Sequence, residues 1–392
     1  MARSPIRTTH VGSLVRPDEL IGLLERRIDG EAVDEQHFAD VLEAAVGEVV
    51  ARQHRLGIDI VNDGEYGKTS SWSQYVMERL GGFELRPAPQ SGTATAIRGK
   101  DYRDFAEFYD EYEGELGVAG IGRKSLRPGR WAITGPIRYI GHAAIGADID
   151  RLQRAMAASG ATEGFLPVVA PGSVVPSRDD EHYGDDEAAL FAIAEAMREE
   201  YRAIVDAGLT LQVDDAYLAS TYDLMVPPAS LEEFRAWARI RIDALNHALE
   251  GIDPSRVRYH VCWGSWNGPH TNDVAAADII DLVLDVRAGG YSLEMANPRH
   301  EHEWRLWERV ALPEGKVLLP GVISHSTNVV EHPELVAERL ERLARLVGPE
   351  RVVASTDCGF AQGPFARRVH PSIMWAKLDA LCRGAELAAA RL

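Results

Sequence analysis

The chain has 392 residues, of which 42 are Lys or Arg and 60 are Asp or Glu, giving a formal net charge of −18. This acidic balance disfavours the phosphate backbone of nucleic acids, so we expect no nucleic-acid partner. Hydrophobic residues make up 45% of the chain and charged residues 26%, the range of globular proteins. There is no apolar signal region at the start and no apolar run near the roughly 20 residues of a membrane span. Three cysteines are too few for a disulfide framework, so we expect a cytoplasmic protein without membrane contact.

Short apolar runs alternate with amphipathic segments, a pattern typical of strands and helices in a parallel sheet. Apolar residues at spacings of three and four predict helices within 190–204 and 332–347. Ser230 with Glu233 resembles a capping box, and Asp273 is placed to cap a further helix. The predicted strands are Thr8–Ser13, Ile58–Asp63, Trp131–Pro136, Thr210–Asp214, Arg258–Trp263, Tyr291–Met295, Val317–Ser324 and Val352–Asp357. Eight such strands predict a (β/α)8 TIM barrel, with a doubly wound open sheet as the alternative.

Two segments are too long to be simple connections. They span about 84–130 and 139–186, on either side of the predicted third strand. Long loops inside a compact domain tend to be functional or to carry structure of their own. Because no linker or internal repeat divides the sequence, we expect one barrel domain over residues 1–392, with insertions around its third strand.

Four residues at the C-terminal ends of predicted strands suit a zinc site. His260 and Cys262 are two positions apart on one strand, so their side chains share a face. Glu294 and Cys358 end later strands, and strand ends meet on one face of a barrel. One imidazole, two thiolates and one carboxylate form a ligand set that zinc accepts. The alternative is a structural role, since buried cysteines commonly pack as small hydrophobic residues; we expect this for Cys382, on a predicted helix.

Acidic and polar residues follow nearly every predicted strand. The four carboxylates among them are Asp63, Glu65, Asp214 and Asp215. Such carboxylates either remain solvated or bind an ammonium group or another cation. His325, in a strand end with Gly and Ser, is a candidate general acid or base and equally a structural histidine. Gly67–Thr69 reads Gly-Lys-Thr but lacks the upstream glycine of a phosphate-binding loop, so we discount that function.

Taken in order, short segments over most of the chain resemble the cobalamin-independent methionine synthases, specifically their zinc-bearing C-terminal barrel. The matching segments are HVGS, IVNDGEYGK, ITGPI, AGLTLQVDD, YHVCWG, SLEMA, PGVISHS and TDCGF. Each match is short, but eight matches in the order of the family are specific.

The resemblance implies a role for each of these strand ends. The residues that would hold Zn²⁺ are His260, Cys262, Glu294 and Cys358. Val11 and Ser13 would lie in the segment whose backbone binds the carboxylate of homocysteine. Glu65 and Asp214 would hold its ammonium group, and His325 would transfer a proton during activation of the methyl donor.

The sequence also departs from the long methionine synthases. Their N-terminal barrel is missing, and their Gln-x-Asp-Glu-Pro motif is Gln-Val-Asp-Asp-Ala at 212–216. The segment CWGSWNGPH and residues 168–174 look more like a single-barrel subgroup that includes the epoxyalkane:coenzyme M transferases. The thiol and the alkyl donor are therefore both left open by the resemblance.

We expect a zinc-dependent transferase that activates a small, homocysteine-like thiol as a zinc thiolate and alkylates it. The resemblance implies methyl transfer from a co-substrate of the methyl-tetrahydrofolate type. One alternative is the opening of an epoxide by a thiol such as coenzyme M. Two further alternatives are a metal-free, decarboxylase-like lyase and a barrel that keeps zinc only for stability. The sequence leaves open whether the protein forms a homo-oligomer.

Overall fold

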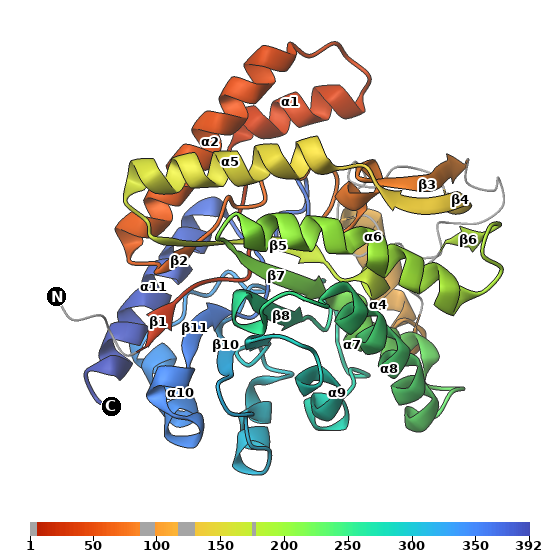
Figure 1. Cartoon of the computed structure of the whole chain (residues 1–392). Helices are drawn as coiled ribbons and strands as arrows, with labels where there is room; N and C mark the ends of the chain where they lie inside the picture. Colours follow the sequence, from red (N-terminus) through yellow and green to blue (C-terminus); the bar gives the residue numbers. More distant parts are fainter. Residues whose placement is uncertain (1–5, 87–98, 117–129, 175–177) are drawn as a thin grey trace.

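The computed structural model describes residues 6–86, 99–116, 130–174 and 178–392. Eight strands form the central sheet in the order β1-β11-β10-β9-β8-β7-β5-β2, and neighbouring strands pair in parallel. These strands are β1 (Arg7–Thr8), β2 (Ile60–Val61), β5 (Glu163–Val169), β7 (Thr210–Asp215), β8 (Val257–Val261), β9 (Gly290–Leu293), β10 (Val317–Ile323) and β11 (Val353–Thr356). Figure 1 shows them curling around a common centre with helices outside, so the predicted (β/α)8 barrel is confirmed.

Several of the helices begin or end at capping residues of the sequence. They are α1 (Asp18–Ile28), α2 (Glu35–Leu56), α3 (Lys100–Asp104), α4 (Ala106–Leu116), α5 (His142–Ser159), α6 (Asp186–Asp206), α7 (Ala216–Met225), α8 (Leu231–Ala248), α9 (Ile280–Leu284), α10 (Pro333–Val347) and α11 (Pro371–Ala389). The side chain of Asp34 accepts two backbone N–H groups at the start of α2, and Gly57 ends that helix with a φ of 94°. The capping box predicted for Ser230 and Glu233 is confirmed at the start of α8.

The prediction that Trp131–Pro136 forms the third barrel strand is wrong. These residues belong to β4 (Arg130–Tyr139), which pairs antiparallel with β3 (Leu80–Arg86) and parallel with the short β6 (Asp179–Asp180). This three-stranded sheet lies beside the barrel (Figure 1). The third barrel strand is β5, within the segment that we assigned to the second insertion.

The exchange of these two strands has a physical reason. β5 is buried along nearly its whole length, so its sequence is an unbroken apolar run, as expected for a strand covered on both faces. The strand also contains a proline, and a glycine precedes its apolar run; both residue types are typical of loops, which is why the segment was predicted to be part of an insertion. The segment between β2 and β5 therefore contains β3, β4, α3 and α4, and then α5, which packs against α2.

The predicted helix cap at Asp273 is also wrong. A short 3₁₀ turn occupies 276–278, and α9 begins only at Ile280. The Asp273 carboxylate instead contacts His270 Nδ1 at 3.2 Å and His300 Nε2 at 3.1 Å. This carboxylate therefore joins two loops beyond the strand ends.

A polar layer inside the barrel lies beneath the strand ends. Arg258 on β8 is buried and donates to Gln212 at 2.6 Å, to Thr9 at 2.9 Å and to the carbonyl of His10 at 2.8 Å. The amide of Gln212 in turn donates to the carbonyl of Val11 and to the carboxylate of Asp214. These bonds fix the ends of β1, β7 and β8 relative to one another.

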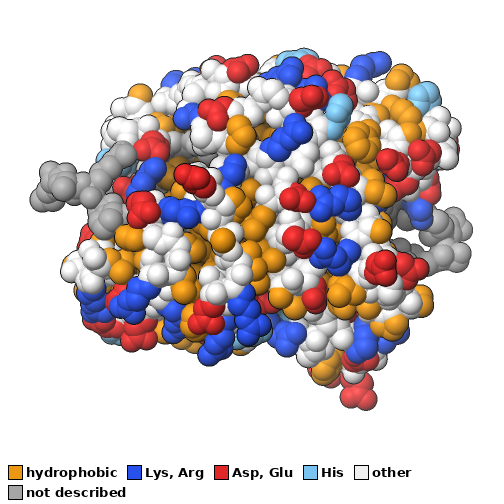
Figure 2. Space-filling view, turned by 60° about the horizontal axis from the view of Figure 1, so that its bottom comes forward, with side chains coloured by type: hydrophobic (Ala, Val, Ile, Leu, Met, Phe, Trp, Pro, Cys, Tyr) orange, Lys and Arg blue, Asp and Glu red, His pale blue; other side chains and the backbone are white. Residues whose placement is uncertain are grey.

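On the face shown in Figure 2, acidic and basic side chains are interspersed, with hydrophobic side chains between them. Within the described ranges, none of the helices combines the length and the apolar character that crossing a bilayer requires. The cysteine of α11, Cys382, is buried in the core as predicted.

Candidate metal and substrate site

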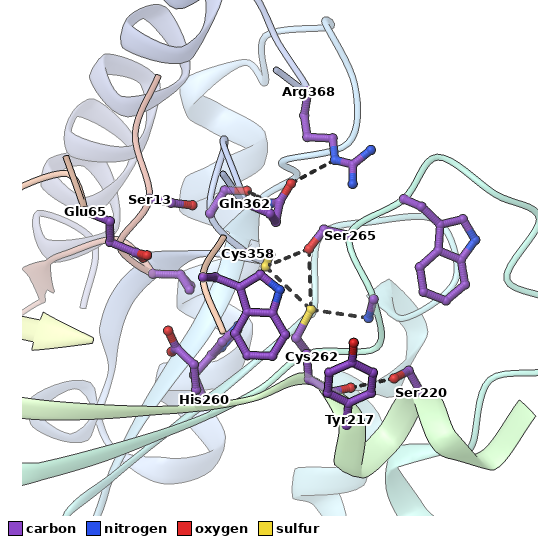
Figure 3. A pocket seen from close by; sticks show the side chains of 17 residues that line it. Ser13, Glu65, Tyr217, Ser220, His260, Cys262, Ser265, Cys358, Gln362 and Arg368 are labelled. Carbon is purple, nitrogen blue, oxygen red and sulfur yellow. Dashed lines mark hydrogen bonds between the residues drawn. The ribbon is translucent and has the colours of Figure 1, made fainter. Parts of the chain in front are cut away.

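Three of the four predicted metal ligands lie together at the C-terminal ends of their strands. His260 is on β8, Cys262 follows β8, and Cys358 follows β11. One donor atom from each residue lies within 4.8 Å of the other two, and all three residues are buried. The two sulfur atoms are 3.5 Å apart (Figure 3).

The arrangement of these donors fits zinc. Two thiolates on one tetrahedral zinc lie about 3.7 Å apart, given Zn–S bonds of about 2.3 Å. His260 Nδ1 contacts the hydroxyl of Ser292 at 3.1 Å, while its Nε2 is buried without a hydrogen-bond partner among the described residues. A second-sphere contact at one ring nitrogen with the other left for the metal is the usual state of a histidine ligand. The chemistry and spacing of His260, Cys262 and Cys358 therefore suit a zinc ion.

The fourth predicted ligand, Glu294, does not join this cluster. Its carboxylate accepts the backbone N–H of Trp263 at 3.0 Å and the amide of Asn297 at 2.8 Å. It belongs to a second group of candidate ligands, with His325 and Asp357. The two groups adjoin, because Asp357 and Cys358 are consecutive in the chain.

His325, the predicted proton-transfer residue, is buried in this second group, and it does not line the pocket. Both of its ring nitrogens lack a hydrogen-bond partner in the described part of the chain. Burial lowers its pKa to about 4, so the ring is neutral at physiological pH. Burial also raises the pKa of neighbouring Asp357 to about 6.

The sulfur atoms influence each other's ionisation. The hydrogen bond from Cys262 lowers the pKa of Cys358 well below its usual value, against the effect of burial, and His260 adds to this lowering. That shared hydrogen bond raises the pKa of Cys262. Burial alone would lower the pKa of His260, but the contact with Cys358 outweighs it and raises that pKa. One sulfur of the pair is therefore readily ionised, as a metal ligand must be.

A pocket with about 730 Å³ of empty space opens above the cluster. All four predicted substrate-binding residues line it, together with the three clustered metal-ligand candidates (Figure 3). These lining residues are Val11, Ser13, Glu65, Asp214, His260, Cys262 and Cys358. The structure thus places a predicted cation site and a predicted metal site in one cavity.

Glu65 and Asp214 are both buried at the wall of this pocket. Asp214 accepts a hydrogen bond of 2.6 Å from Gln212, and burial raises its pKa to about 7. Glu65 has a φ of 60°, which side-chain-bearing residues seldom adopt. A Cβ at Gly12 would lie 2.6 Å from Glu65 Oε1, so only glycine leaves room for this carboxylate.

The first-strand segment is anchored to the end of β11. The N–H of Val11 donates to the hydroxyl of Thr356 at 3.2 Å. The carbonyl of Ser13 accepts the N–H of Phe360 at 2.8 Å, and its hydroxyl accepts the N–H of Ala361 at 3.4 Å. Val11 and Ser13 therefore line the pocket with their backbone already held in place.

The other two predicted carboxylates do not line the pocket. Asp215 caps α7 and accepts hydrogen bonds from Ser173 at 2.7 Å and Tyr259 at 2.8 Å, so its role is structural. Asp63 faces a second, smaller cavity, where burial raises its pKa to about 6.

Several residues that line the pocket were not predicted. They are Trp72, Ala216, Tyr217, Ser220, Gly264, Ser265, Trp266, Gly359, Gln362 and Arg368. Trp266 is held by Tyr109 of α4, whose hydroxyl accepts its indole N–H at 3.0 Å, and by ring stacking with His270 at 4.2 Å. The signal for Ser265 and Trp266 was their closeness in sequence to Cys262, whereas no sequence signal connected Tyr109 to the pocket.

The chain is similar to known proteins in both sequence and fold. The family model of the catalytic domain of cobalamin-independent synthases matches residues 167–370, just over half of the chain. The 2-hydroxypropyl-CoM lyase of Xanthobacter autotrophicus is 25% identical over 382 residues, covering 90% of this chain and 86% of that protein. A methionine synthase of Thermococcus kodakarensis is 24% identical over 390 residues, covering 97% and 92%.

A B12-independent methionine synthase from Shewanella sp. W3-18-1 shares the fold. Its structure superposes with a TM-score of 0.72 at 20% identity and covers 100% of this chain and 99% of that one. With the family model matching the strands that carry the clustered cysteines and histidine, the chain belongs to the cobalamin-independent methionine synthase family.

Proposed function

We propose that this protein is a zinc-dependent transferase that alkylates the sulfur of a small amino thiol, with homocysteine as the substrate type. The observation that carries the proposal is the His260–Cys262–Cys358 cluster in the same pocket as Glu65 and Asp214. His260, Cys262 and Cys358 would hold the zinc, and Glu294, at the neighbouring strand end, is the proposed fourth ligand. Bound zinc would lower the pKa of an incoming thiol and keep it deprotonated at neutral pH.

The residues around the cluster would orient the thiol. Glu65 and Asp214 would bind its ammonium group, because both carboxylates are buried at the wall of the pocket and Asp214 has no ion-pair partner among the described residues. Val11 and Ser13 lie beside its carboxylate. Trp72, Tyr217 and Trp266 line the same cavity and exclude water from the reacting sulfur. His325 would transfer a proton during activation of the alkyl donor; because it does not line the cavity, this transfer needs a group between His325 and the donor.

The alkyl donor that we propose is a methyl-tetrahydrofolate. The relatives named methionine synthase and 2-hydroxypropyl-CoM lyase suggest two acceptors, homocysteine and coenzyme M. The carboxylates Glu65 and Asp214 favour a thiol that carries an amine, which coenzyme M lacks. Epoxide opening with a coenzyme M-type thiol is the second candidate function.

The test combines metal analysis with an alkylation assay. We expect one zinc per chain, loss of activity on chelation, recovery with added zinc, and S-methylation of homocysteine by methyl-tetrahydrofolate. Turnover of a simple epoxide with coenzyme M, and none of methyl-folate with any thiol, would establish the second candidate instead. If the X-ray absorption spectrum at the zinc edge stays the same when any of the thiols is added, the bound zinc has a purely structural function. Full activity without metal would refute the proposal.

A further inference from the structure

A buried lysine lies directly behind the substrate pocket. Lys68 Nζ is 2.9 Å from Glu65 Oε2, and the two side chains are only 9% and 5% exposed. The same ammonium group is 4.5 Å from the centre of the Tyr75 ring. The Gly-Lys-Thr segment that contains Lys68 lacks the upstream glycine of a phosphate-binding loop, and the position of this lysine beside Glu65 points to another function.

Hydrogen bonds hold the backbone of this loop in place, and Glu65 is the ion-pair partner of Lys68 among the described residues. The guanidinium of Arg16 donates to the carbonyl oxygens of both Glu65 and Lys68, and the N–H of Lys68 donates to Glu65 O at 3.1 Å. The backbone of Glu65 is fixed in a left-handed conformation. The orientation of the Glu65 carboxylate therefore depends on the groups that contact it. On one side it faces the glycine at position 12, and on the other it meets Lys68.

The second carboxylate of the pocket has a different environment. Asp214 accepts its hydrogen bond from the neutral amide of Gln212, and the guanidinium of Arg258 donates to the other end of that amide. Over the described ranges, no cation lies within ion-pair distance of Asp214, whereas Glu65 is paired. The pocket therefore offers one carboxylate in direct contact with a cation of the protein and one, Asp214, on which the charge of Lys68 acts only from a greater distance.

We propose that Lys68 is a positioning residue that holds the Glu65 carboxylate against the pocket and balances its charge, so that the site accepts a thiol with a single ammonium group. This inference rests on the proposed function, because it concerns how the same thiol is recognised. Lys68 acts through Glu65 and does not touch the substrate. An ammonium group in the pocket would bind Asp214 as its counter-ion and Glu65 as an oriented acceptor.

Substitution of Lys68 tests this arrangement. In Lys68→Ala, Glu65 loses its partner and, as an isolated buried carboxylate, protonates or turns away. We expect the KM for homocysteine to rise about tenfold or more, the size of a lost charge-assisted hydrogen bond. The kcat should change less than about threefold, because the bound thiol still reaches the metal. The KM for 2-mercaptoethanol, which has no amine, should stay within about twofold of the wild-type value.

Chemical rescue separates an electrostatic role from a structural one. Lys68 lines the second cavity, which has about 290 Å³ of empty space and also includes Asp63, Tyr75 and Arg79. Millimolar ethylammonium should enter the space left in Lys68→Ala and restore the homocysteine KM, whereas tetramethylammonium and NaCl should not. Lys68→Met fills most of this space with an uncharged side chain, so it should show the same defect without rescue. Lys68→Arg, which keeps the charge, should retain most of the affinity.

Two controls complete the design. Lys316→Ala removes an ammonium that donates to the carbonyl of Ala288, at the opposite end of the strands from the pocket, and should leave the homocysteine KM unchanged. Tyr75→Phe keeps the ring beneath Lys68 and should do the same. Equal loss with homocysteine and 2-mercaptoethanol, or a defect of Lys68→Ala that ethylammonium does not repair, would overturn the role of Lys68. Failure of the wild-type protein to bind any amino thiol in calorimetry would instead overturn the proposed function.

Discussion

The sulfur atoms of Cys262 and Cys358 lie 3.5 Å apart, although 96 positions separate the two residues in the chain. The parallel order of strands β8 to β11 produces this contact, because every strand delivers its C-terminal end to the same face. Neither cysteine is held by a local turn, so the two sulfur atoms meet only in the folded barrel. Replacing either cysteine should therefore change the metal site without disturbing the neighbouring secondary structure.

Replacing either cysteine should remove the metal and leave the barrel intact. We expect Cys262→Ser and Cys358→Ser to purify with only a small fraction of the metal bound by the wild-type protein, and to lose activity. Their circular dichroism spectra should match the wild type. Cys382→Ser, a substitution in the core on α11, should keep its metal. An unchanged metal content in both pocket variants would contradict the assignment of the site.

Removing the second-sphere partner of His260 should weaken metal binding by a smaller amount. Ser292→Ala deletes the hydroxyl 3.1 Å from His260 Nδ1, so the ring is no longer oriented toward the cysteines. Losses of about 10-fold in metal affinity are typical of such changes. Competition with a chromogenic chelator measures the effect, and Ser255→Ala, an exposed change in the turn before β8, provides the control. Equal affinities for the two variants would mean that Ser292 does not support a ligand.

Neutralising Asp214 should reduce the preference for thiols that carry an amine. Asp214→Asn preserves the shape of the side chain but removes the negative charge facing the pocket. We expect homocysteine to bind about tenfold more weakly or worse, and 2-mercaptoethanol to bind within about twofold of wild type. Titration calorimetry on the metal-loaded protein gives both values. If both thiols weaken equally, the carboxylate has a role other than recognition of an ammonium group.

A buried ion network that lines the second, smaller cavity should contribute strongly to the free energy of unfolding. Arg79 pairs with Asp148 at 2.5 Å and with Glu200 at 2.8 Å, and Glu200 also accepts the hydroxyl of Tyr139 at 2.6 Å. Arg79→Met should lower the free energy of unfolding by about 3–5 kcal/mol, because Glu200 is left buried and unpaired. Urea denaturation measures this loss. The control Arg86→Met breaks an exposed pair and should cost less than about 1 kcal/mol.

The barrel could be predicted because most of its strands have a recognisable local pattern of apolar and polar residues. Seven of the eight predicted strands overlap the strands of the barrel, since short apolar runs followed by polar residues mark where a parallel strand ends. The exception, β5, shows the limit of such patterns. A strand that is buried on both faces has no alternation, and the choice between it and Trp131–Pro136 depends on which segment the rest of the barrel accepts.

The site could be predicted only as far as strand ends determine it. His260, Cys262 and Cys358 meet because they terminate strands that the fold brings together. Glu294 is delivered to the same face, but its rotamer follows the hydrogen bonds from Trp263 and Asn297, which no spacing rule encodes. The support of Trp266 was not predictable either, because Tyr109 of α4 reaches it from a different part of the chain.

The pairing of β1 with β11 sets the order of events during synthesis. The first strand finds its hydrogen-bonding neighbour only after more than 340 further residues have left the ribosome. Cys358 emerges at the same late stage, just behind that strand. A nascent chain therefore carries His260 and Cys262 without the ligand that completes the cluster. We expect metal insertion to follow barrel closure, so that zinc acquisition by newly made protein reports on completed folding rather than assisting it.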